Sequence, residues 1–244
     1  MRFGIISDIH GNFPALQAVL EALDHQKVAY VFCAGDVVGY GPHPEKCIRT
    51  VQRRGITCVR GNHDQYVIAE EKPTGKFSHP STVQAIEWTR ENLSDEAKDW
   101  LAGLPFQYSD TDFEIVHASH VINPKWMYVT DIEKATLNFM FQEHRVSFNG
   151  HTHVPLLAER AEGSAVRFDY LRTMYLDADK QYLIGAGAVG QPRDKDPRAC
   201  ALLLDTEEQH VQVLRVPYAL QAVQEDIITA GLPSVLGERL EAGK

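Results

Sequence analysis

Short apolar runs that stop abruptly at polar residues constrain the fold of this chain more than any other feature. Three such runs follow one another in the first quarter of the sequence, at 2–7, 30–34 and 56–59. The first stops at Asp8, the second ends in Gly35-Asp36, and the third ends in an Arg-Gly-Asn-His-Asp sequence. A run of four to eight apolar residues that ends in a polar turn is typical of a buried β-strand.

Helical patterns lie between these strands. Asn12 can cap a helix that has Pro14 in its first turn. Apolar residues then recur at helical spacing, at Leu16, Val19, Leu20 and Leu23. After the proline-rich turn at 41–44, a second helix is expected through Cys47, Ile48 and Val51. Strands that alternate with helices predict βαβ units and a largely parallel sheet.

Beyond residue 80 the pattern changes. Helices are expected at 82–92, 95–104 and 132–143, with a strand at 113–116. A series of strands with few helices between them follows, at 146–148, 155–160, 165–170, 181–186, 199–204 and 211–216, and 219–229 is a closing helix. No repeat, linker or charge run divides the chain, so we expect one α/β domain over 1–244. The polar stretch 70–80 predicts a surface excursion inside a helical, cap-like insertion at about 65–104.

Composition excludes several classes of protein. There are 24 Lys and Arg residues against 33 Asp and Glu, a net charge of −9, which disfavours a nucleic-acid partner because affinity for phosphate backbones comes from basic residues. The four cysteines form no CxxC pair, and we interpret them as reduced core residues. No apolar run approaches the roughly 18 residues of a membrane span, and the first run is too short for a signal peptide. We therefore expect a cytoplasmic protein without membrane association.

Five polar clusters follow predicted strands. Their members are carboxylate, imidazole and amide side chains: Asp8 and His10; Asp36; Asn62, His63 and Asp64; His117; His151 and His153. In an extended segment residues i and i+2 project to the same side, so Asp8 with His10, and His151 with His153, can each point into one crevice. Ligands of open α/β sheets collect beyond the carboxyl ends of the strands, where all five clusters would lie.

This set of side chains predicts metal binding. Imidazole, carboxylate and amide ligands without thiolate suit first-row divalent ions. A single histidine at a strand end is more often a hydrogen-bonded structural residue, but five coinciding clusters favour a metal site. Seven candidate ligands are too many for one tetrahedral ion and suit two ions that share a carboxylate. His63 is surplus to this ligand count and could donate a proton to a leaving oxygen.

The sequences DIH, GDVVG, GNHD, VH and GHTH occur in this order at 8–10, 35–39, 61–64, 116–117 and 150–153. Together they resemble the motifs of the calcineurin-like metallophosphoesterase superfamily, and more narrowly its small prokaryotic phosphodiesterase branch. The resemblance covers the whole chain. It implies a four-layer α-β-β-α sandwich with a dinuclear metal site at its rim.

The same resemblance implies a role for each motif residue. Asp8, His10 and His153 would hold one metal ion, and Asn62, His117 and His151 would hold the other. Asp36 would bridge the two ions. His63 matches the family's catalytic histidine, and Asp64 would orient His63 by a hydrogen bond.

Other residues are weaker candidates. The glycine-rich segment 185–194 resembles a loop near the family's site, although it lacks the usual Asn and Ser. It contains Arg193, which could bind phosphate or form a surface ion pair with Asp194 or Asp196, and Arg60 is a second candidate for substrate binding. His120 departs from the family pattern and is either a loop residue or a neighbour of the second metal. Phe77 and His79, in the polar excursion, could line the cleft.

We therefore expect a metal-dependent phosphoesterase that uses two divalent ions, any of Mn, Fe, Zn, Co or Ni, on a small phosphorylated substrate. A hydroxide that bridges the metals would attack phosphorus in line, with His63 as the general acid. The resemblance favours phosphodiesters. A phosphomonoesterase or nucleotide phosphatase is the alternative, and a non-catalytic metal-binding scaffold is disfavoured because His63 and all seven ligand positions are present. The residues do not indicate the oligomeric state.

Overall fold

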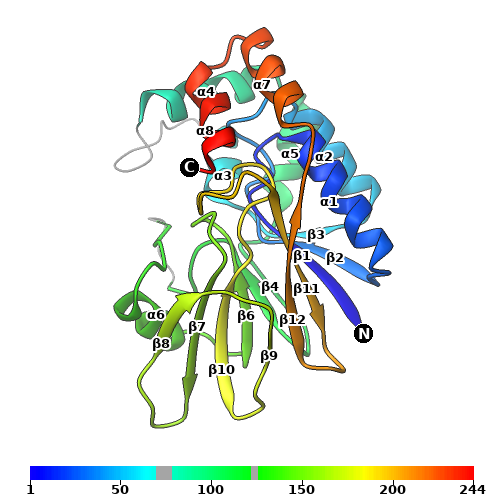
Figure 1. Cartoon of the computed structure of the whole chain (residues 1–244). Helices are drawn as coiled ribbons and strands as arrows, with labels where there is room; N and C mark the ends of the chain where they lie inside the picture. Colours follow the sequence, from blue (N-terminus) through cyan, green and yellow to red (C-terminus); the bar gives the residue numbers. More distant parts are fainter. Residues whose placement is uncertain (70–78, 122–125) are drawn as a thin grey trace.

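Two six-stranded sheets pack face to face at the centre of the structure, a computed structural model that describes residues 1–69, 79–121 and 126–244 (Figure 1). Apolar side chains from both sheets fill the space between them. Phe113 lies in the middle of this layer and makes edge-to-face contacts with Phe3, Phe32 and Phe148 at centroid distances of 5.7, 5.1 and 5.6 Å. Each such pair adds about 0.5–1.5 kcal/mol beyond the burial of its apolar area, so this cluster holds the sheets together.

The first sheet carries the first βαβ units of the chain. Its strand order is β3 (Thr57–Cys58), β2 (Tyr30–Cys33), β1 (Arg2–Ile6), β11 (Ala199–Asp205), β12 (His210–Val216) and β9 (Met174–Tyr175). β1, β2 and β3 are parallel, whereas β11 pairs with β1 in the antiparallel sense. The carboxyl ends of the three parallel strands therefore meet at one edge of the sheet.

The second sheet is built from the middle of the chain. Its order is β4 (Gln107–Ser109), β5 (Glu114–Val116), β6 (Val146–Asn149), β10 (Lys180–Gly185), β7 (Leu156–Ala161) and β8 (Arg167–Tyr170). β5, β6 and β10 are parallel, and the outer strands are antiparallel.

Helices cover the outer face of each sheet and complete four layers. On the first sheet lie α1 (Phe13–His25) and α2 (Pro44–Arg53), with α3 (Asn62–Ile68), α4 (Pro80–Glu91) and α5 (Asp95–Gly103) in the same apolar cluster. On the second sheet lies α6 (Ile132–Phe139). The predicted α-β-β-α sandwich is confirmed. Among the described residues, none of the helices is both long and apolar enough to span a membrane.

The local signals of the sequence explain most of these elements. The Asn12 side chain caps α1 by accepting a hydrogen bond from the Ala15 amide at 3.2 Å, as expected. The predicted strands and helices are present, with ends shifted by one to four residues. The predicted helix at 132–143 ends at Phe139. Four of the described elements were not predicted: α3, which begins inside the GNHD motif, the short strands β4 and β9, and a C-terminal helix, α8 (Ser234–Ala242).

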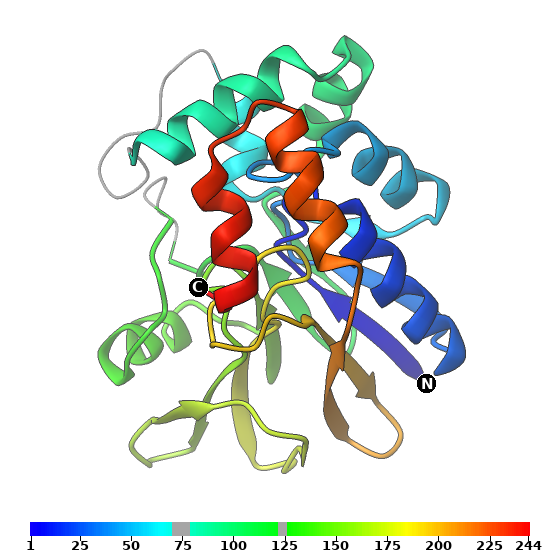
Figure 2. The same ribbon diagram turned by 45° about the horizontal axis from the view of Figure 1, so that its top comes forward.

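The chain closes with a helical hairpin, α7 (Leu220–Thr229) and α8 (Ser234–Ala242). It packs on Tyr40 and on Ala85 of α4 through Val223, Ile227, Leu236 and Leu240. Figure 2 shows the hairpin lying across the rim of the sandwich, above the loops that leave the carboxyl ends of the strands. The polar excursion expected at 70–80, including Phe77, lies almost entirely outside the described residues.

Candidate metal centre

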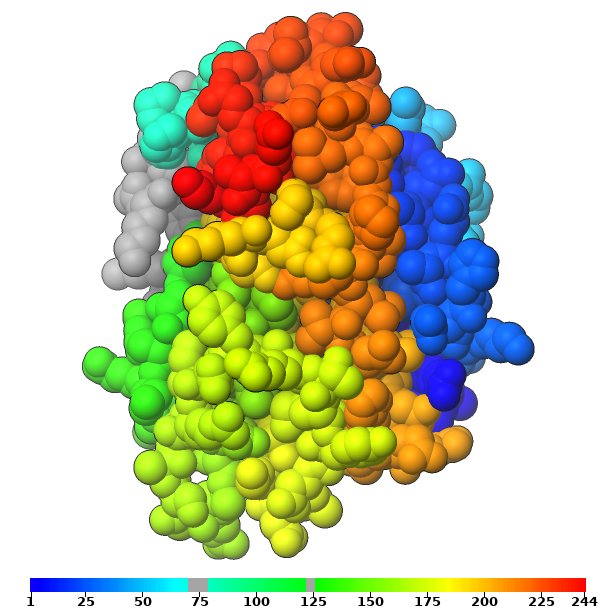
Figure 3. Space-filling view, in the orientation of Figure 1, coloured from blue at the N-terminus to red at the C-terminus, as the bar shows by residue number. Residues whose placement is uncertain are grey.

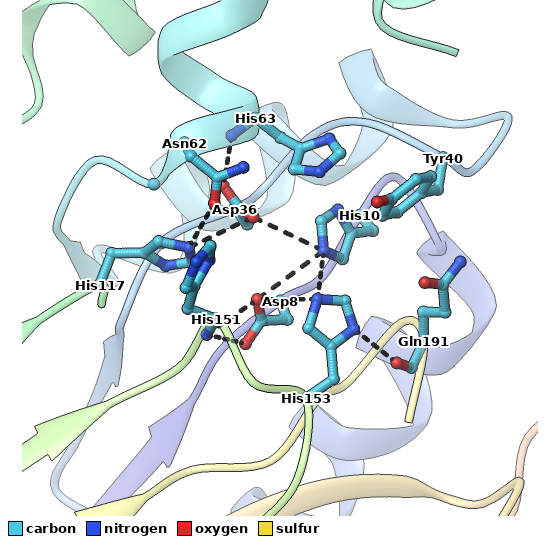
Figure 4. A network of polar contacts seen from close by, with 12 residues as sticks. Asp8, His10, Asp36, Tyr40, Asn62, His63, His117, His151, His153 and Gln191 are labelled. Atoms are coloured by element: carbon cyan, nitrogen blue, oxygen red, sulfur yellow. Dashed lines mark hydrogen bonds and ion pairs between the residues drawn. The ribbon is translucent and has the colours of Figure 1, made fainter. Parts of the chain in front are cut away.

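The five predicted polar clusters converge on one buried centre at the rim between the two sheets (Figure 4). Asp8 and His10 follow β1, Asp36 follows β2, Asn62 and His63 begin α3, His117 follows β5, and His151 and His153 follow β6. Every one of these side chains is at most 3% exposed. Segments more than 140 residues apart in the sequence thus meet at one site, as the strand-end argument predicted.

Asp8, His10 and His153 form the first group of side chains that could hold an ion. The Nδ1 atoms of His10 and His153 lie 3.1 and 2.6 Å from the carbonyl oxygens of Val38 and Gln191. A carbonyl only accepts, so each Nδ1 carries the proton and each Nε2 has a lone pair. The two Nε2 atoms are 3.1 Å apart. Two lone pairs that face each other repel unless a cation lies between them, and so this group fits a metal ion.

His117, His151 and Asn62 form the second group. His117 donates Nδ1–H to the Ala34 carbonyl at 2.7 Å, and its Nε2 lies 3.0 Å from the Asn62 Oδ1. His151 donates Nε2–H to the Trp126 carbonyl at 3.0 Å, which makes Nδ1 its coordinating nitrogen. The ring of His151 lies within coordinating reach of His117 and Asp36.

Asp36 lies between the two groups. Its Oδ2 is 3.6 Å from His10 Nε2 and 3.3 Å from His117 Nε2, and it has no hydrogen-bond partner among the described residues. Burial raises the pKa of Asp36, but the neighbouring His117 and His63 outweigh burial and hold this pKa below its usual range. A buried carboxylate oxygen without a hydrogen bond is costly. Asp36 is therefore placed to share its carboxylate between two cations.

The charges at the centre favour a bound positive charge. Burial lowers the pKa of His117, but Asp36 outweighs burial and the pKa rises to about 10. Burial raises the pKa of Asp8 to about 7, and the charge of Asp36 adds to this effect. A site that retains protons this strongly at neutral pH favours positive charge, as a metal site must.

The backbone at the centre is strained. Asp8, His10, Asp36, His151 and His153 all have φ between 48° and 66°, the left-handed region that L-residues rarely adopt. Such residues cost about 1–3 kcal/mol each and cluster at functional sites.

The glycines of the motifs allow this packing. A Cβ atom on Gly150 would lie 1.8 Å from the Ser7 hydroxyl and 2.6 Å from Asp8 Oδ2. A Cβ atom on Gly61 would lie 2.1 Å from Asp36 Oδ1. Only glycine fits at both positions, because the backbone approaches a candidate ligand too closely for a side chain.

His63 lies at the edge of the centre, with its ring centroid 4.7 Å from that of His10 and 4.4 Å from that of Tyr40. Its Nδ1 has no hydrogen-bond partner among the described residues. Burial lowers the pKa of His63 to about 4.

The expected hydrogen bond from Asp64 to His63 is absent from the described contacts. The Asp64 carboxylate accepts hydrogen bonds from the amides of Asp36, Val37 and Val38 at 2.9, 2.9 and 3.2 Å and from that of Gly61 at 3.0 Å. Asp64 thus fixes the loop after β2, on which Asp36 lies, and not the His63 ring. The physical reason is that α3 begins at Asn62: the third helical residue turns back toward the helix N-terminus, where unsatisfied amides need an acceptor.

The two predicted substrate-binding arginines lie in different surroundings. The Arg193 guanidinium donates to Gln191 Oε1 at 2.9 Å and lies 3.5 Å from the Tyr40 hydroxyl, beside the metal centre. The two carboxylates that could have paired with Arg193 form ion pairs with other arginines, Asp194 with Arg215 and Asp196 with Arg198. Arg60 instead donates to Gln65 Oε1 and to the Leu104 carbonyl, both at 3.0 Å.

The two other histidines named as candidates, His120 and His79, lie away from the candidate metal centre. His120 Nε2 is 2.7 Å from the Ser147 hydroxyl and 3.5 Å from Glu114, so it is part of a separate buried polar cluster. His79 Nδ1 lies 2.8 Å from the Ser81 hydroxyl just before α4. Within the part of the chain that the structure describes, neither histidine belongs to a group that could hold an ion.

Two tyrosines at the centre were not predicted. The ring of Tyr40 lies 4.7 Å from the ring of His10, and the ring of Tyr128 stacks on that of His151 at 3.9 Å. Tyr40 directly follows the GDVVG motif, which could have indicated it. Tyr128 lies in an irregular segment that has no local signal, and only the tertiary structure places it.

Comparison with known proteins agrees with this geometry. The family model of the calcineurin-like phosphoesterase superfamily domain matches residues 1–209, and the chain belongs to this superfamily. An uncharacterized protein of Methanocaldococcus jannaschii is 34% identical over 98% of this chain and 97% of its own length. The crystal structure of a metallophosphoesterase from Sphaerobacter thermophilus, 37% identical, superposes with a TM-score of 0.86 over 100% of this chain and 99% of that one.

A symmetrical bis(5'-nucleosyl)-tetraphosphatase of Hamiltonella defensa is 27% identical over 64% of this chain. The chain matches 55% of the length of that relative. Family membership and these relatives make the protein a metal-dependent phosphoester hydrolase.

Proposed function

We propose that this protein is a phosphodiesterase with a dinuclear metal centre. Asp8, His10 and His153 would hold one divalent ion, Asn62, His117 and His151 would hold the second, and Asp36 would bridge them. The observation that carries this assignment is the position of the Asp36 carboxylate, within 3.6 Å of histidines from both groups and with one oxygen lacking a hydrogen bond among the described residues.

When bound, two ions of this kind neutralise phosphate oxygens and lower the pKa of water to make a nucleophile. The mixed nitrogen and oxygen ligands accept Mn, Fe, Zn, Co or Ni, and availability decides among them. The residues of the chain supply the rest. His10, His117, His151 and His153 hold fixed orientations through backbone carbonyls, so the centre needs little reorganisation before reaction.

We assign proton donation to His63. Its pKa of about 4 means that the ring is neutral at neutral pH when no anion lies beside it. A bound phosphate brings negative charge beside the ring, which raises the pKa of an imidazole and favours the protonated form. The leaving oxygen would then take the proton from His63. Asp64 acts at a distance, by holding the loop of Asp36.

The names of several relatives support the choice of substrate class. Those named bis(5'-nucleosyl)-tetraphosphatase act on compounds in which each phosphate is linked on two sides, which supports a substrate of the diester type. A phosphomonoesterase or nucleotide phosphatase is the alternative. We place the protein in the cytoplasm, where thiols stay reduced, because all four cysteines are free and buried.

The test is hydrolysis of bis-p-nitrophenyl phosphate and of p-nitrophenyl phosphate by metal-stripped protein resupplied with Mn²⁺. We expect metal-dependent turnover with the diester preferred. A preference for the monoester would replace the phosphodiesterase assignment by the alternative. Failure to hydrolyse either compound, with two ions bound per chain by elemental analysis, would contradict the proposed activity.

A further inference from the structure

The glycine-rich segment 185–194 is attached to the loop after β1. The amide of Gly190 donates to the carbonyl of Asp8 at 2.8 Å. A Cβ atom on Gly190 would lie 1.9 Å from the carbonyl oxygen of Ile9, so only glycine allows this close approach. In Figure 3 the segment around residues 187–198 lies at the surface, between the C-terminal hairpin and the second sheet. The side chains of this segment therefore start from a backbone that is fixed against the metal centre.

Gln191 contacts both the metal centre and Arg193 (Figure 4). Its main-chain carbonyl accepts the Nδ1–H of His153 at 2.6 Å. Its side chain belongs to a residue that is only 1% exposed, and the Oε1 atom accepts hydrogen bonds from Nε and Nη2 of Arg193 at 3.3 and 2.9 Å. Two donors on one acceptor fix the plane of the guanidinium as well as its position. One buried residue thus holds a candidate metal ligand with its backbone and an arginine with its side chain.

Tyr40 is a shared neighbour of Arg193 and of two histidines at the centre. The Tyr40 hydroxyl lies 3.5 Å from Nη2 of Arg193, and the guanidinium carbon lies 5.9 Å from the centre of the Tyr40 ring. The same ring contacts His10 and His63, at centroid distances of 4.7 and 4.4 Å. The guanidinium is therefore one ring away from a candidate metal ligand and from the assigned proton donor.

The contacts that orient Arg193, with Gln191 and Tyr40, are with neutral groups. Among the residues that the structure describes, the half-buried Arg193 forms no ion pair, since Asp194 and Asp196 pair with other arginines. A carboxylate partner would cancel the attraction of the guanidinium for an anion, whereas a neutral amide oxygen leaves it in place. Gln191 accepts from two of the five N–H donors of the guanidinium, so donors remain for an oxygen of a bound phosphate.

We propose that Arg193 binds a phosphate oxygen at the metal centre and that Gln191 is the positioning residue that orients its guanidinium. This inference rests on the proposed function, because it needs a phosphate group at the centre. It adds a fixed positive charge of the chain itself to the charge that bound ions supply.

The test measures binding of inorganic phosphate to the Mn²⁺-loaded protein by isothermal titration calorimetry, with the metal content of each variant determined in parallel. We expect Arg193→Gln to weaken binding at least about tenfold, the size of a hydrogen bond to a charged group, and Arg193→Lys to recover part of the loss. Gln191→Met, which keeps the approximate size of the side chain and removes the acceptor, should weaken binding about three- to tenfold.

The double variant separates positioning from a general effect on the fold. If Gln191 acts through Arg193, then Gln191→Met added to Arg193→Gln should change phosphate binding by less than about twofold. A loss as large as that caused by Gln191→Met alone would overturn the positioning role of Gln191.

Arg198→Gln is the matched control, because it removes the same charge from the neighbouring loop, where Arg198 is already paired with Asp196. It should leave phosphate binding unchanged, and thermal melting should show that all variants fold. An unchanged affinity in Arg193→Gln, an equal fall in Arg198→Gln, or loss of bound Mn²⁺ from Arg193→Gln would overturn the role of Arg193. A wild-type protein that shows the expected pattern but hydrolyses no phosphoester would overturn the proposed function and leave this inference standing.

Discussion

The histidines at the centre keep their ring orientation through backbone carbonyl oxygens. His10, His117 and His153 each give Nδ1–H to a carbonyl, whereas His151 gives Nε2–H. In each ring the remaining nitrogen faces the centre. The ligand geometry is therefore built into the backbone before any ion arrives. The Nδ1 of His63 has no such partner among the described residues, although His63 lies within coordinating reach of His10 and Asp36.

At the residue scale, we expect His63→Ala to retain two bound ions and to lose about 10²- to 10⁴-fold in kcat, the usual contribution of a general acid. The loss should be smallest for diesters with acidic leaving groups, which depart without a proton. Turnover of a series of aryl diesters, with the metal content measured in parallel, checks this. His25→Ala, which changes an exposed histidine of α1, is the control. Loss of the ions in His63→Ala would contradict the assigned role.

Asp36→Asn should weaken both metal sites together, because an amide cannot offer two negatively charged oxygens to two cations. We expect less than one ion per chain to remain after dialysis, measured by elemental analysis. The same substitution at the fully exposed Asp95 should leave two ions bound. If the Asp36 variant kept two tightly bound ions, the bridging role would be wrong.

At the scale of elements, α3 joins the two halves of the centre. Its first two residues, Asn62 and His63, point into the centre, while the Asp64 carboxylate in the same turn accepts hydrogen bonds from four backbone amides, three of them in the loop after β2. The His63 amide in turn donates to Asp36 Oδ1 at 2.7 Å. The start of α3 and the loop after β2 therefore form one unit, and neither can move without the other.

We predict that Asp64→Ala lowers the free energy of unfolding by about 3 kcal/mol or more, because it leaves several buried amides without an acceptor. It should also weaken metal binding, since the loop of Asp36 loses its anchor. Chemical denaturation and metal titration measure the two effects. The control is Asp131→Ala, which removes the cap of α6 far from the centre and should cost only about 1 kcal/mol. Equal effects of the two variants would show that Asp64 is an ordinary helix cap.

For the whole molecule, the metal centre links the two sheets. Asp8 and Asp36 come from the first sheet, His117 and His151 from the second, and the left-handed backbone at several of these residues stores strain. Bound ions would hold both sheets at the rim, while the phenylalanine cluster around Phe113 holds them in the interior.

Removal of the ions should therefore lower the melting temperature of the whole domain, since a ligand present at 100 times its Kd stabilises by about 2.7 kcal/mol. The effect depends on pH. Without a bound cation, His117, with a pKa of about 10, is protonated at neutral pH, and Asp8, with a pKa of about 7, is about half protonated, so both must release protons to bind metal. Affinity for Mn²⁺ should thus fall as the pH falls from about 10, where His117 takes up its proton, and more steeply below about 7, where Asp8 does so as well.

Calorimetric melting with and without a chelator at several pH values checks both parts of this prediction. Proton release on Mn²⁺ binding, measured in buffers of different ionisation enthalpy, gives an independent readout. A melting temperature that does not depend on metal, or a Mn²⁺ affinity that rises as the pH falls, would contradict it.

The sequence by itself determined the sandwich and the convergence of the metal-binding side chains. Parallel strands of one sheet end at the same edge, so Asp8 and Asp36 must meet at the edge of the first sheet, and His117 and His151 at that of the second. The family resemblance, and not the strand pattern, implied that the two edges meet. The motif glycines Gly61 and Gly150 could be noted from the sequence, but only the close approach to Asp36 and Asp8 explains why no other residue fits.

Only the tertiary structure decided the contacts that depend on distant partners. Asp64 follows His63 in the chain, yet its carboxylate accepts the amides of another loop because helix α3 turns it away from the ring. Arg60 and Arg193 were both candidates for substrate binding from the sequence. In the structure Arg60 lies against the end of α5, whereas Arg193 lies beside the candidate metal centre. The end of α8 contacts the loop of Arg193, through Gly243 and Lys195, only because the C-terminal hairpin folds back across the rim. Local sequence patterns predict where a strand ends, but the packing of segments that are far apart in the sequence decides which side chains become neighbours.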